Sequence, residues 1–351
     1  MTTLAEELKA RIARFGPITI AEFMAECLLH PTHGYYTTRD PLGRGGDFIT
    51  APEISQMFGE MLGLCLAQVW MDQGQLARFT LAELGPGRGT LMADVLRATR
   101  AVPGFTDAAD VHLVEVSPAL RSAQAEAVAD AVFHDSVETL PDQPLFLIAN
   151  EFFDALPIRQ FVRADGGWSE RMVGLDGDQL VFGLSTAAPI AMLDDKLDVT
   201  EIGEMVETCG ALPGICHVIG DLIERNGGAA LMVDYGAWDA RGNTFQAVKG
   251  HQKVDPLASP GDADLTAHVD FAALAQATPS AATHMTHQGI FLERLGITQR
   301  AQRLADGLSG DALTEHIAAH RRLTHPEEMG HLFKVIGFHP HGTQPPPGLT
   351  S

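Results

Sequence analysis

The sequence is short of cysteine and of positive charge, and each shortage excludes a class of protein. Its four cysteines are widely spread and form no Cys-x-x-Cys pair, so we expect reduced, buried thiols rather than a disulfide framework. Lys and Arg total 24 against 45 for Asp and Glu, which gives a formal net charge of −21 with neutral histidines. This balance argues against nucleic acid or an anionic membrane surface as a partner and leaves room for a cationic one.

Long apolar runs are also missing. No uninterrupted apolar stretch reaches the length of about 18 residues that a membrane-spanning helix needs, so we expect no membrane insertion. The first residues, MTTLAEELKARIARFGP, have apolar side chains at helical spacing and lack the central apolar stretch of a signal peptide. We therefore expect an intracellular protein, cytoplasmic in a bacterium or in the mitochondrial matrix in a eukaryote.

What the chain does contain is an alternation of short apolar strands and helices. Five apolar stretches predict strands, at residues 80–84, 111–116, 131–134, 145–149 and 230–234. Continuous apolar strands with helical crossovers are typical of a parallel sheet covered on both faces, which predicts an α/β fold. In such sheets a ligand binds at the carboxyl ends of the strands.

Composition divides the chain into a cap, a main domain and a tail. Residues 1–75 are predicted to form an N-terminal helical cap and lid, and residues 76–340 the α/β domain, with insertions at about 158–215 and 237–270. The first insertion carries two Asp-Gly turns between apolar runs, which predict short antiparallel strands. The second insertion is predicted to be polar loop, and the Pro-rich tail, 341–351, is expected to be frayed.

A glycine-rich turn follows the first of these strands. The segment LAELGPGRGT places Gly85, Gly87 and Gly89 between a strand and a helix. Without side chains the backbone can turn tightly and let a ligand lie against the start of the helix. The spacing departs from the dinucleotide pattern G-x-G-x-x-G. With Glu83 it resembles instead the E-x-G-x-G-x-G pattern of S-adenosylmethionine-dependent methyltransferases, and a glycine-rich connection without a ligand is the alternative.

Polar side chains at the ends of the next strands are candidates for the rest of a cofactor site. Glu115 ends the second strand, where a carboxylate can accept hydrogen bonds from both ribose hydroxyls. Asp135 follows the third strand and can receive an adenine amino group, although a helix N-cap is an equal alternative. Asn150 ends the fourth strand beside them. A solvated acid at a strand end is the alternative for Glu115.

Five blocks of sequence, in order along most of the chain, resemble the MidA-type methyltransferases, a family that includes a mitochondrial complex I assembly factor. The blocks are HGYYTTRDPLGRGGDFITAPEIS (33–55), AELGPGRGTLMADVLR (82–97), VHLVEVSPALR (111–121), ANEFFDALPIRQF (149–161) and VDPLASPGDADLTAHVDF (254–271).

The resemblance implies both a fold and an activity. It implies a class I fold dependent on S-adenosyl-L-methionine (SAM), with a seven-stranded sheet whose antiparallel last strand would be residues 333–338. It also implies protein arginine methylation. The product would be symmetric dimethylarginine on the 49-kDa-type subunit of NADH dehydrogenase, in support of complex I assembly.

Two acids after the fourth strand are the candidate catalytic residues. Glu151 and Asp154 lie in the segment NEFFDALP, beside the place expected for the methyl donor. A guanidinium is a poor nucleophile because its charge is delocalised and it stays protonated. Carboxylates can hold it in a bidentate manner and aim one nitrogen at the methyl group. The alternative is that Asp154 caps a helix and that Glu151 is structural.

Aromatic and polar residues elsewhere are candidates for contact with the substrate. Tyr35 and Tyr36, with Asp47 and Phe48, are predicted to form a lid over the cofactor and peptide channel, with a packed N-terminal cap as the alternative. His268 belongs to a polar segment that also holds His251, Asp255, Asp262 and Asp264. This segment either lines the peptide groove or is simply a structured loop.

No metal site is expected from the sequence. The histidine pairs His30/His33 and His284/His287 lie outside an H-E-x-x-H setting and have no cysteine partner. Two further functions stay open beside the arginine methyltransferase. One is an assembly chaperone on a methyltransferase fold, and the other is a methyltransferase of another acceptor, because a fold alone does not choose the acceptor.

Overall fold

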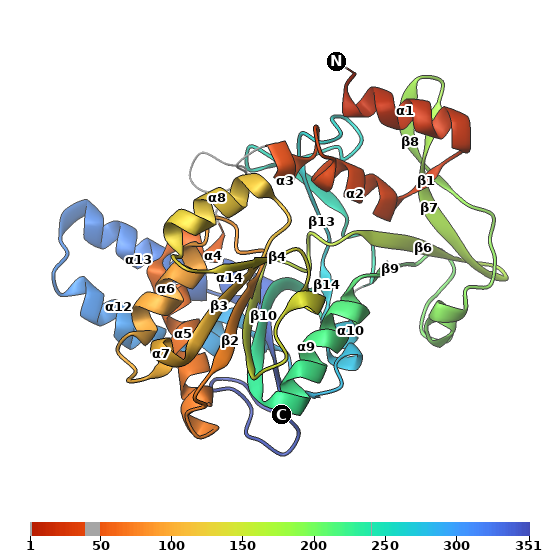
Figure 1. Cartoon of the computed structure of the whole chain (residues 1–351). Coiled ribbons are helices and arrows are strands. Elements are labelled where there is room, and N and C mark those ends of the chain that lie inside the picture. The colour runs from red at the N-terminus through yellow and green to blue at the C-terminus, as the bar shows by residue number, and fades with distance from the viewer. Residues whose placement is uncertain (1, 39–49, 240) are drawn as a thin grey trace.

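The computed structural model describes residues 2–38, 50–239 and 241–351, and its centre is a mostly parallel sheet with helices on both faces (Figure 1). The main path of the sheet runs, in order, through β15 (Ala281–Ala282), β17 (Phe333–His339), β10 (Gly228–Ala237), β5 (Leu145–Asn150), β2 (Phe79–Leu84), β3 (Ala109–Val114) and β4 (Val132–His134).

The direction of the last long strand confirms the predicted fold class. Strand β10 pairs with β5 in parallel, as do β5 with β2, β2 with β3, and β3 with β4, whereas β17 runs antiparallel to β10. Two short strands join the sheet off this path, β14 (Val269–Asp270) on β10 and β16 (Thr286–His287) on β17. Strands β15 and β16 both pair antiparallel with β17.

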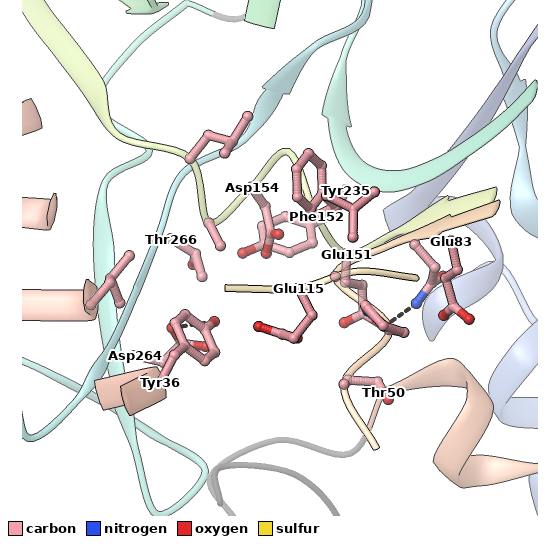
Figure 2. Close-up of a pocket in the computed structure, with 18 of the residues that line it drawn as sticks. Tyr36, Thr50, Glu83, Glu115, Glu151, Phe152, Asp154, Tyr235, Asp264 and Thr266 are labelled. Carbon is pink, nitrogen blue, oxygen red and sulfur yellow. Dashed lines mark hydrogen bonds between the residues drawn. The ribbon is translucent and has the colours of Figure 1, made fainter. Parts of the chain in front are cut away.

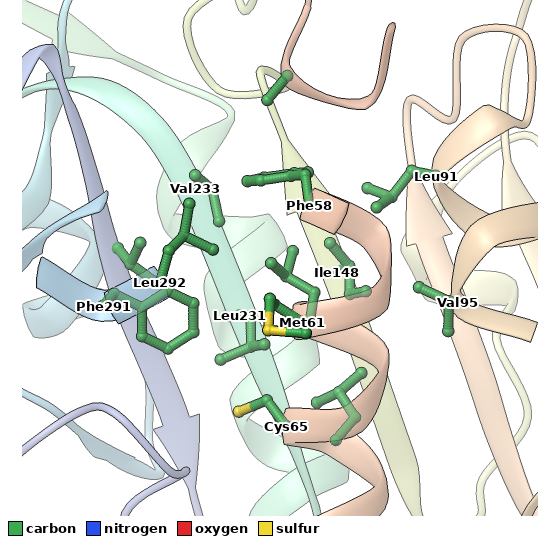
Figure 3. Close-up of a cluster of buried hydrophobic side chains, with 14 of the residues drawn as sticks. Phe58, Met61, Cys65, Leu91, Val95, Ile148, Leu231, Val233, Phe291 and Leu292 are labelled. Atoms are coloured by element: carbon green, nitrogen blue, oxygen red, sulfur yellow. The ribbon is translucent and has the colours of Figure 1, made fainter. Parts of the chain in front are cut away.

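The central strands are apolar on both faces because each face is covered by helices. Leu81 of β2 points to one face, toward α5 (Gln56–Asp72) and α6 (Thr90–Thr99), and the next residue, Ala82, points to the opposite face. That second face is covered by α9 (Leu212–Asn226) and α10 (Phe271–Ala277). Figure 3 shows Phe58 and Met61 of α5 packed against strand residues such as Leu231.

Several shorter helices complete the main body. They are α7 (Phe105–Ala108), α8 (Pro118–Ala127), α11 (Gln288–Arg294), α12 (Ile297–Ala305), α13 (Gly310–Thr324) and α14 (Met329–Leu332). Short 3₁₀ turns lie at Val137–Thr139 and Ala191–Lys196. Among the helices of the described segments, none is both long enough and apolar enough to cross a membrane.

The N-terminal cap packs against the first insertion. The cap holds α1 (Leu4–Phe15), β1 (Ile18–Thr19), α2 (Ile20–Leu29), α3 (Tyr35–Thr38) and α4 (Ala51–Ile54). Helix α2 starts at a capping box in which Thr19 and Glu22 bond each other's backbone N–H, and it ends before Pro31. Strand β1 pairs antiparallel with β7, so the cap and the insertion share a sheet.

The first insertion forms the antiparallel strands that its Asp-Gly turns predict. Strands β6 (Ile158–Ala164), β7 (Gly167–Asp176), β8 (Gln179–Leu184) and β9 (Met205–Cys209) join β1 in the order β1-β7-β6-β9, with β8 on the far side of β7. The turns at Gly166 and Gly177 have φ of +82° and +58°, which glycine adopts without steric cost.

The second insertion differs from the prediction of a polar loop. It contains a small antiparallel sheet of β11 (Gln246–Lys249), β12 (Gln252–Val254) and β13 (Asp264–Thr266). The prediction was wrong because these strands are too short to show a period and β12 is exposed throughout. Ala247 and Leu265 from this sheet are buried together with α1 and α2, so the sheet forms one wall beneath the cap.

The Pro-rich tail is packed rather than frayed. Leu349 is buried, and the backbone N–H of His284 donates to the carbonyl of Thr350 at 2.7 Å. A Cβ on Gly348 would come within 2.9 Å of the ring of Phe291, which shows how closely the tail follows α11. The expectation from proline content overlooked the single large apolar residue that anchors the segment.

Candidate active site

A cavity of about 1000 Å³ opens at the carboxyl ends of the parallel strands, where a ligand is expected in this type of sheet (Figure 2). Its walls come from the glycine turn, the ends of β3, β5 and β10, the cap and the second insertion. The predicted site residues that line it are Tyr36, Glu83, Gly85, Gly87, Glu115, Asp135, Asn150, Glu151, Asp154 and His268.

The glycine turn forms one wall of this cavity. Gly85 and Gly87 have φ of +58° and +55°, in the left-handed region that favours glycine. A Cβ on Gly85 would come within 3.0 Å of the ring of Phe152. Gly89 is different, because it does not line the cavity and a Cβ there would face Ala127 of α8 at 3.3 Å. The absence of a side chain at Gly89 therefore allows close packing between α6 and α8, and its predicted contact with a cofactor stays a prediction.

Glu115 is held in place by the start of α8. Its carboxylate accepts hydrogen bonds from the backbone N–H of Ser117 at 2.7 Å and from Nε2 of Gln124 at 3.1 Å. Gln124 Nε2 also donates to the carbonyl of Gly87 at 2.7 Å, which links the carboxylate to the glycine turn. Burial raises the pKa of Glu115. Gln124 is a site residue that sequence reasoning missed, because mid-helix glutamine carries no recognisable signal.

Three buried acceptor atoms in the cavity wall lack a hydrogen-bond donor within the described segments. They are Glu83 Oε2, Asn150 Oδ1 and Asp154 Oδ1. Burial raises the pKa of Glu83 to about 8. Leaving a buried polar atom without a partner costs about 1–3 kcal/mol, so a wall with three such atoms suits a ligand that donates hydrogen bonds.

Glu151 has a strained backbone and a buried carboxylate. Its φ is +51°, a region that residues other than glycine rarely occupy and that is often found at functional sites. Its Oε1 accepts from the backbone N–H of Ala51 at 3.2 Å and from Nδ2 of Asn150 at 3.1 Å. Burial, with the nearby carboxylate of Asp154, raises the pKa of Glu151 to about 8.

Asp154 does not cap a helix. The chain after β5 runs through turns directly to β6, so the proposed helix is absent from this described segment. The side chain is buried, and burial raises its pKa. The backbone N–H groups of Phe153 and Asp154 both donate to Asp234 Oδ2, at 3.1 and 3.3 Å.

Asp234, which was not among the predicted site residues, therefore shapes the turn that carries Asp154. Burial raises the pKa of Asp234 well above its usual value, and the neighbouring Asp154 and Glu151 add to the shift. The signal that could have found it is its position. It stands near the end of the fifth strand, in the segment ALMVDYG, as Glu115 stands at the end of the second.

The far end of the cavity joins the cap to the second insertion. The hydroxyl of Tyr36 donates to Asp264 Oδ1 at 2.8 Å, and Figure 2 shows this pair across the cavity from Asp154. His268 also lines this end, and burial lowers its pKa. Thr266 and Tyr235, both missed from the sequence, lie beside them.

Other predicted contacts fall outside the cavity or at its edge. Tyr35 is fully buried in the core of the cap, where it packs edge-on to Tyr36, and it does not line the cavity. Asp135 lines the cavity but its side chain is 86% exposed and pairs with Arg121 at 2.6 Å. Asp47 and Phe48 lie outside the described residues. In the second insertion His251 and Asp264 line the cavity, whereas Asp255 and Asp262 do not.

The buried acids lack a basic counterpart in the described part of the chain. Glu151, Asp154 and Asp234 form no ion pair with Lys, Arg or His among these residues, and Asp154 raises the pKa of both Glu151 and Asp234. Buried charges are normally paired. Buried carboxyl groups that have no ion-pair partner among the described residues suit a cationic ligand.

Comparisons with known proteins agree with this geometry. Residues 61–290 match the model of a family of S-adenosyl-L-methionine-dependent methyltransferases. The zebrafish protein (Danio rerio) named protein arginine methyltransferase NDUFAF7, mitochondrial, is 36% identical, and the match covers 95% of this chain and 86% of that protein. The Drosophila melanogaster homologue of the same name is 37% identical over 96% of this chain and 85% of its own.

A solved structure extends the similarity to three dimensions. A Burkholderia thailandensis protein, crystallised with bound S-adenosyl-homocysteine, superposes with a TM-score of 0.83 at 30% identity and covers 96% of this chain and 91% of its own. The glycine turn at positive φ, the oriented Glu115 and the unpaired acceptors fit a bound adenosyl group. The chain therefore belongs to the family of S-adenosyl-L-methionine-dependent methyltransferases that includes protein arginine methyltransferase NDUFAF7, and S-adenosyl-L-methionine is its cofactor.

Proposed function

We propose that this protein is a SAM-dependent protein arginine methyltransferase. The observation that carries the proposal is the group of buried carboxyl groups at Glu151 and Asp154, with no basic partner among the described residues. The names of the relatives support it. A guanidinium supplies the missing positive charge, and its planar donors match a pair of carboxylates.

The cofactor lies along the glycine turn in this proposal. Gly85 and Gly87 let the cofactor approach the backbone closely. Glu115 accepts hydrogen bonds from the ribose hydroxyls. Glu83 and Asn150 accept hydrogen bonds from the other donors of the cofactor. Asp135, at the exposed edge of the cavity, faces the adenine. When bound, SAM supplies an activated methyl group on a sulfonium, so the protein mainly provides alignment and electrostatics.

The acceptor arginine enters from the end of the cavity marked by Tyr36, Asp264 and His268. Glu151 and Asp154 accept hydrogen bonds from its guanidinium, localise the charge and turn one nitrogen toward the methyl group. The nitrogen forms a bond to the methyl carbon, the bond from carbon to sulfur breaks, and the nitrogen loses a proton. With its raised pKa, Glu151 is suited to accept that proton near neutral pH.

The proposed substrate is a protein segment with an accessible arginine. The names of the relatives indicate an arginine in a protein. The family resemblance alone suggests the 49-kDa-type subunit of NADH dehydrogenase as that protein, and methylation would then support assembly of that complex. The proposed compartment is the cytoplasm for a bacterial chain and the mitochondrial matrix for a eukaryotic one.

Labelled methyl transfer tests the proposal directly. Purified protein is incubated with SAM carrying a radiolabelled methyl group and the 49-kDa-type subunit, and mass spectrometry locates the modified residue. We expect methylarginine at a defined position. We expect no transfer when that arginine is changed to lysine, because an ammonium group lacks the planar set of donors that pairs with carboxylates in a bidentate manner. Methyl found only on lysine, glutamine or a small molecule contradicts the arginine assignment. Stable complex formation without transfer favours the chaperone instead.

A further inference from the structure

A cluster of three metal-ligand side chains lies in the N-terminal cap, away from the proposed active site. Glu7 comes from α1, and His30 and His33 come from the turn that follows α2. One potential ligand atom of each lies within 4.8 Å of the other two, and it is the only such group of three found among the described residues. None of the three lines the active-site cavity.

Two distances in this cluster, one to each oxygen of Glu7, are longer than a usual hydrogen bond and match the spacing of ligands around a tetrahedral ion. His30 Nε2 lies 3.3 Å from Glu7 Oε2, and His33 Nε2 lies 3.5 Å from Glu7 Oε1. A hydrogen bond from nitrogen to oxygen is usually about 2.9–3.0 Å long. Zinc ligands about 2.0–2.2 Å from the ion lie roughly 3.3–3.5 Å from one another in a tetrahedron. Two imidazoles with one carboxylate are also a ligand set that zinc uses, with a fourth position left open.

Neighbouring groups already hold the ligands in place. The two imidazole rings are stacked, with centroids 5.1 Å apart. Thr32 Oγ1 lies 3.3 Å from His30 Nδ1, where it can accept a hydrogen bond from Nδ1–H and leave Nε2 free for a metal. The backbone N–H of Thr32 donates to this same nitrogen at 3.3 Å, so zinc binding at Nε2 would move the ring proton to Nδ1 and replace that bond by the one to Thr32 Oγ1. Thr2 Oγ1 donates to Glu7 Oε1 at 3.0 Å.

The other histidine pairs of the fold lack this arrangement. His112 and His134 contact each other directly, with Nδ1 and Nε2 at 2.8 Å, so those two nitrogens are occupied by one hydrogen bond. His287 and His331 are close, with ring centroids 4.4 Å apart, but they do not form part of a three-ligand group within the described residues. The difference in the cap is the carboxylate that α1 brings between two imidazoles.

We propose that Glu7, His30 and His33 form a binding site for a zinc ion. The site joins α1 to the turn after α2, and the chain continues from His33 directly into α3, which carries Tyr36 into the cavity wall. Zinc would fix the cap and the start of this segment. The proposal is independent of the methyl acceptor, because none of its ligands contacts the cavity.

Zinc titration of the full chain tests this site. The protein is stripped with a chelator, titrated with zinc chloride by calorimetry, and its bound zinc is counted by mass spectrometry. We expect one zinc per chain and a higher melting temperature in its presence, because zinc binds the folded state. Glu7→Gln and His33→Ala should each bind zinc at least tenfold more weakly, and the control His287→Ala should bind as the wild type does.

Two further measurements keep the result clear. Cobalt(II) in the wild-type protein should give the visible absorption of a tetrahedral site, and this absorption should be lost in His33→Ala. Thr32→Val leaves all three ligands in place and should still weaken zinc binding by several-fold, through loss of the bond to His30 Nδ1. Equal zinc affinity in the wild type and in folded His33→Ala, or no bound zinc in the wild type, overturns the proposal.

Discussion

Two acids in different places, Glu60 on α5 and Glu151 after β5, show how differently this fold treats negative charge. Glu60 of α5 is 2% exposed and accepts hydrogen bonds from Arg97 at 2.7 Å and from Arg300 at 2.6 and 3.0 Å. Burial alone would raise its pKa, but the bonds from Arg300 and Arg97 lower the pKa below its usual value. Glu151 is half-buried, has no such partner in the described segments, and has its pKa raised to about 8.

The difference separates a structural acid from a functional one. Glu60 is satisfied within the chain, where it links α5, α6 and α12. Glu151 is left for a ligand to satisfy. Burial alone therefore does not identify a site, whereas burial without an internal cation does. The predictions below test this distinction, from the largest expected effect to the smallest.

Glu151→Gln should abolish methyl transfer while the protein stays folded. Glutamine keeps the size of the side chain but cannot localise the charge of a guanidinium, so we expect the rate to fall by at least about 100-fold, as for loss of other preorganised charges. SAM affinity, measured by calorimetry, should stay within about twofold of the wild type. Methyl transfer at the wild-type rate by the purified variant would refute the assignment of this acid.

Glu60→Gln should lower the stability of the protein and leave methyl transfer unchanged. The variant loses a charged acceptor for two arginines, and we expect a loss of about 1–3 kcal/mol in the free energy of unfolding, measured by denaturant titration. The effect is limited because both arginines are partly exposed and can turn to water. Transfer activity per folded molecule should be unchanged. A large loss of activity without loss of stability would show that the two acids are not distinct in role.

Glu115→Ala should weaken SAM binding without preventing it. The change removes up to two charge-assisted hydrogen bonds, each worth about 1.5–3 kcal/mol, so affinity should fall at least about tenfold. Asp135→Asn is the matched control at the exposed rim, and we expect less than about threefold there. If calorimetry shows that Glu115→Ala changes SAM affinity by less than twofold, a residue other than Glu115 binds the ribose.

The two acids should also respond to pH in opposite directions. For Glu151 the folded pKa of about 8 lies above the ordinary value of 4.5. The folded state thus holds the proton more tightly, and this contribution to stability declines as pH rises from about 4.5 to 8. The lowered pKa of Glu60 gives a contribution to stability that is present near neutral pH and declines as pH falls through the acid range.

The effect of Glu151 is measured by denaturant titration of the wild type and of Glu151→Gln at several pH values from 5 to 8. The stability of the variant relative to the wild type should increase as pH rises. If both proteins change in stability with pH in the same way, the prediction for Glu151 is wrong.

The central sheet could be predicted from sequence because its strands are mostly apolar, with acids only near their carboxyl ends. β2, β5 and β10 are buried on both faces, and this leaves an apolar run that no surface segment shows. The strands of the second insertion gave no such signal. Each is three or four residues long, and β12 is entirely exposed.

The site was predictable where a residue type stood at a strand end, as with Glu115 and Glu151. It was not predictable where tertiary packing assigned the role. Asp234 could not be found this way because its strand reads only as core, although its carboxylate organises the turn after the neighbouring strand β5. Gly89 and Gly85 look alike in sequence, yet one faces α8 and the other faces Phe152. Glu7 and His33 are 26 residues apart, and only the fold brings them together.

The unpaired acids of the cavity have a consequence for the heat of ligand binding. A carboxyl group with a pKa near 8 is largely protonated at pH 7. A cationic ligand that pairs with its charged form must first displace that proton into the solution. Binding of an arginine-bearing peptide should therefore release protons, and the enthalpy measured in Tris should differ from that measured in phosphate by the difference in buffer ionisation heat.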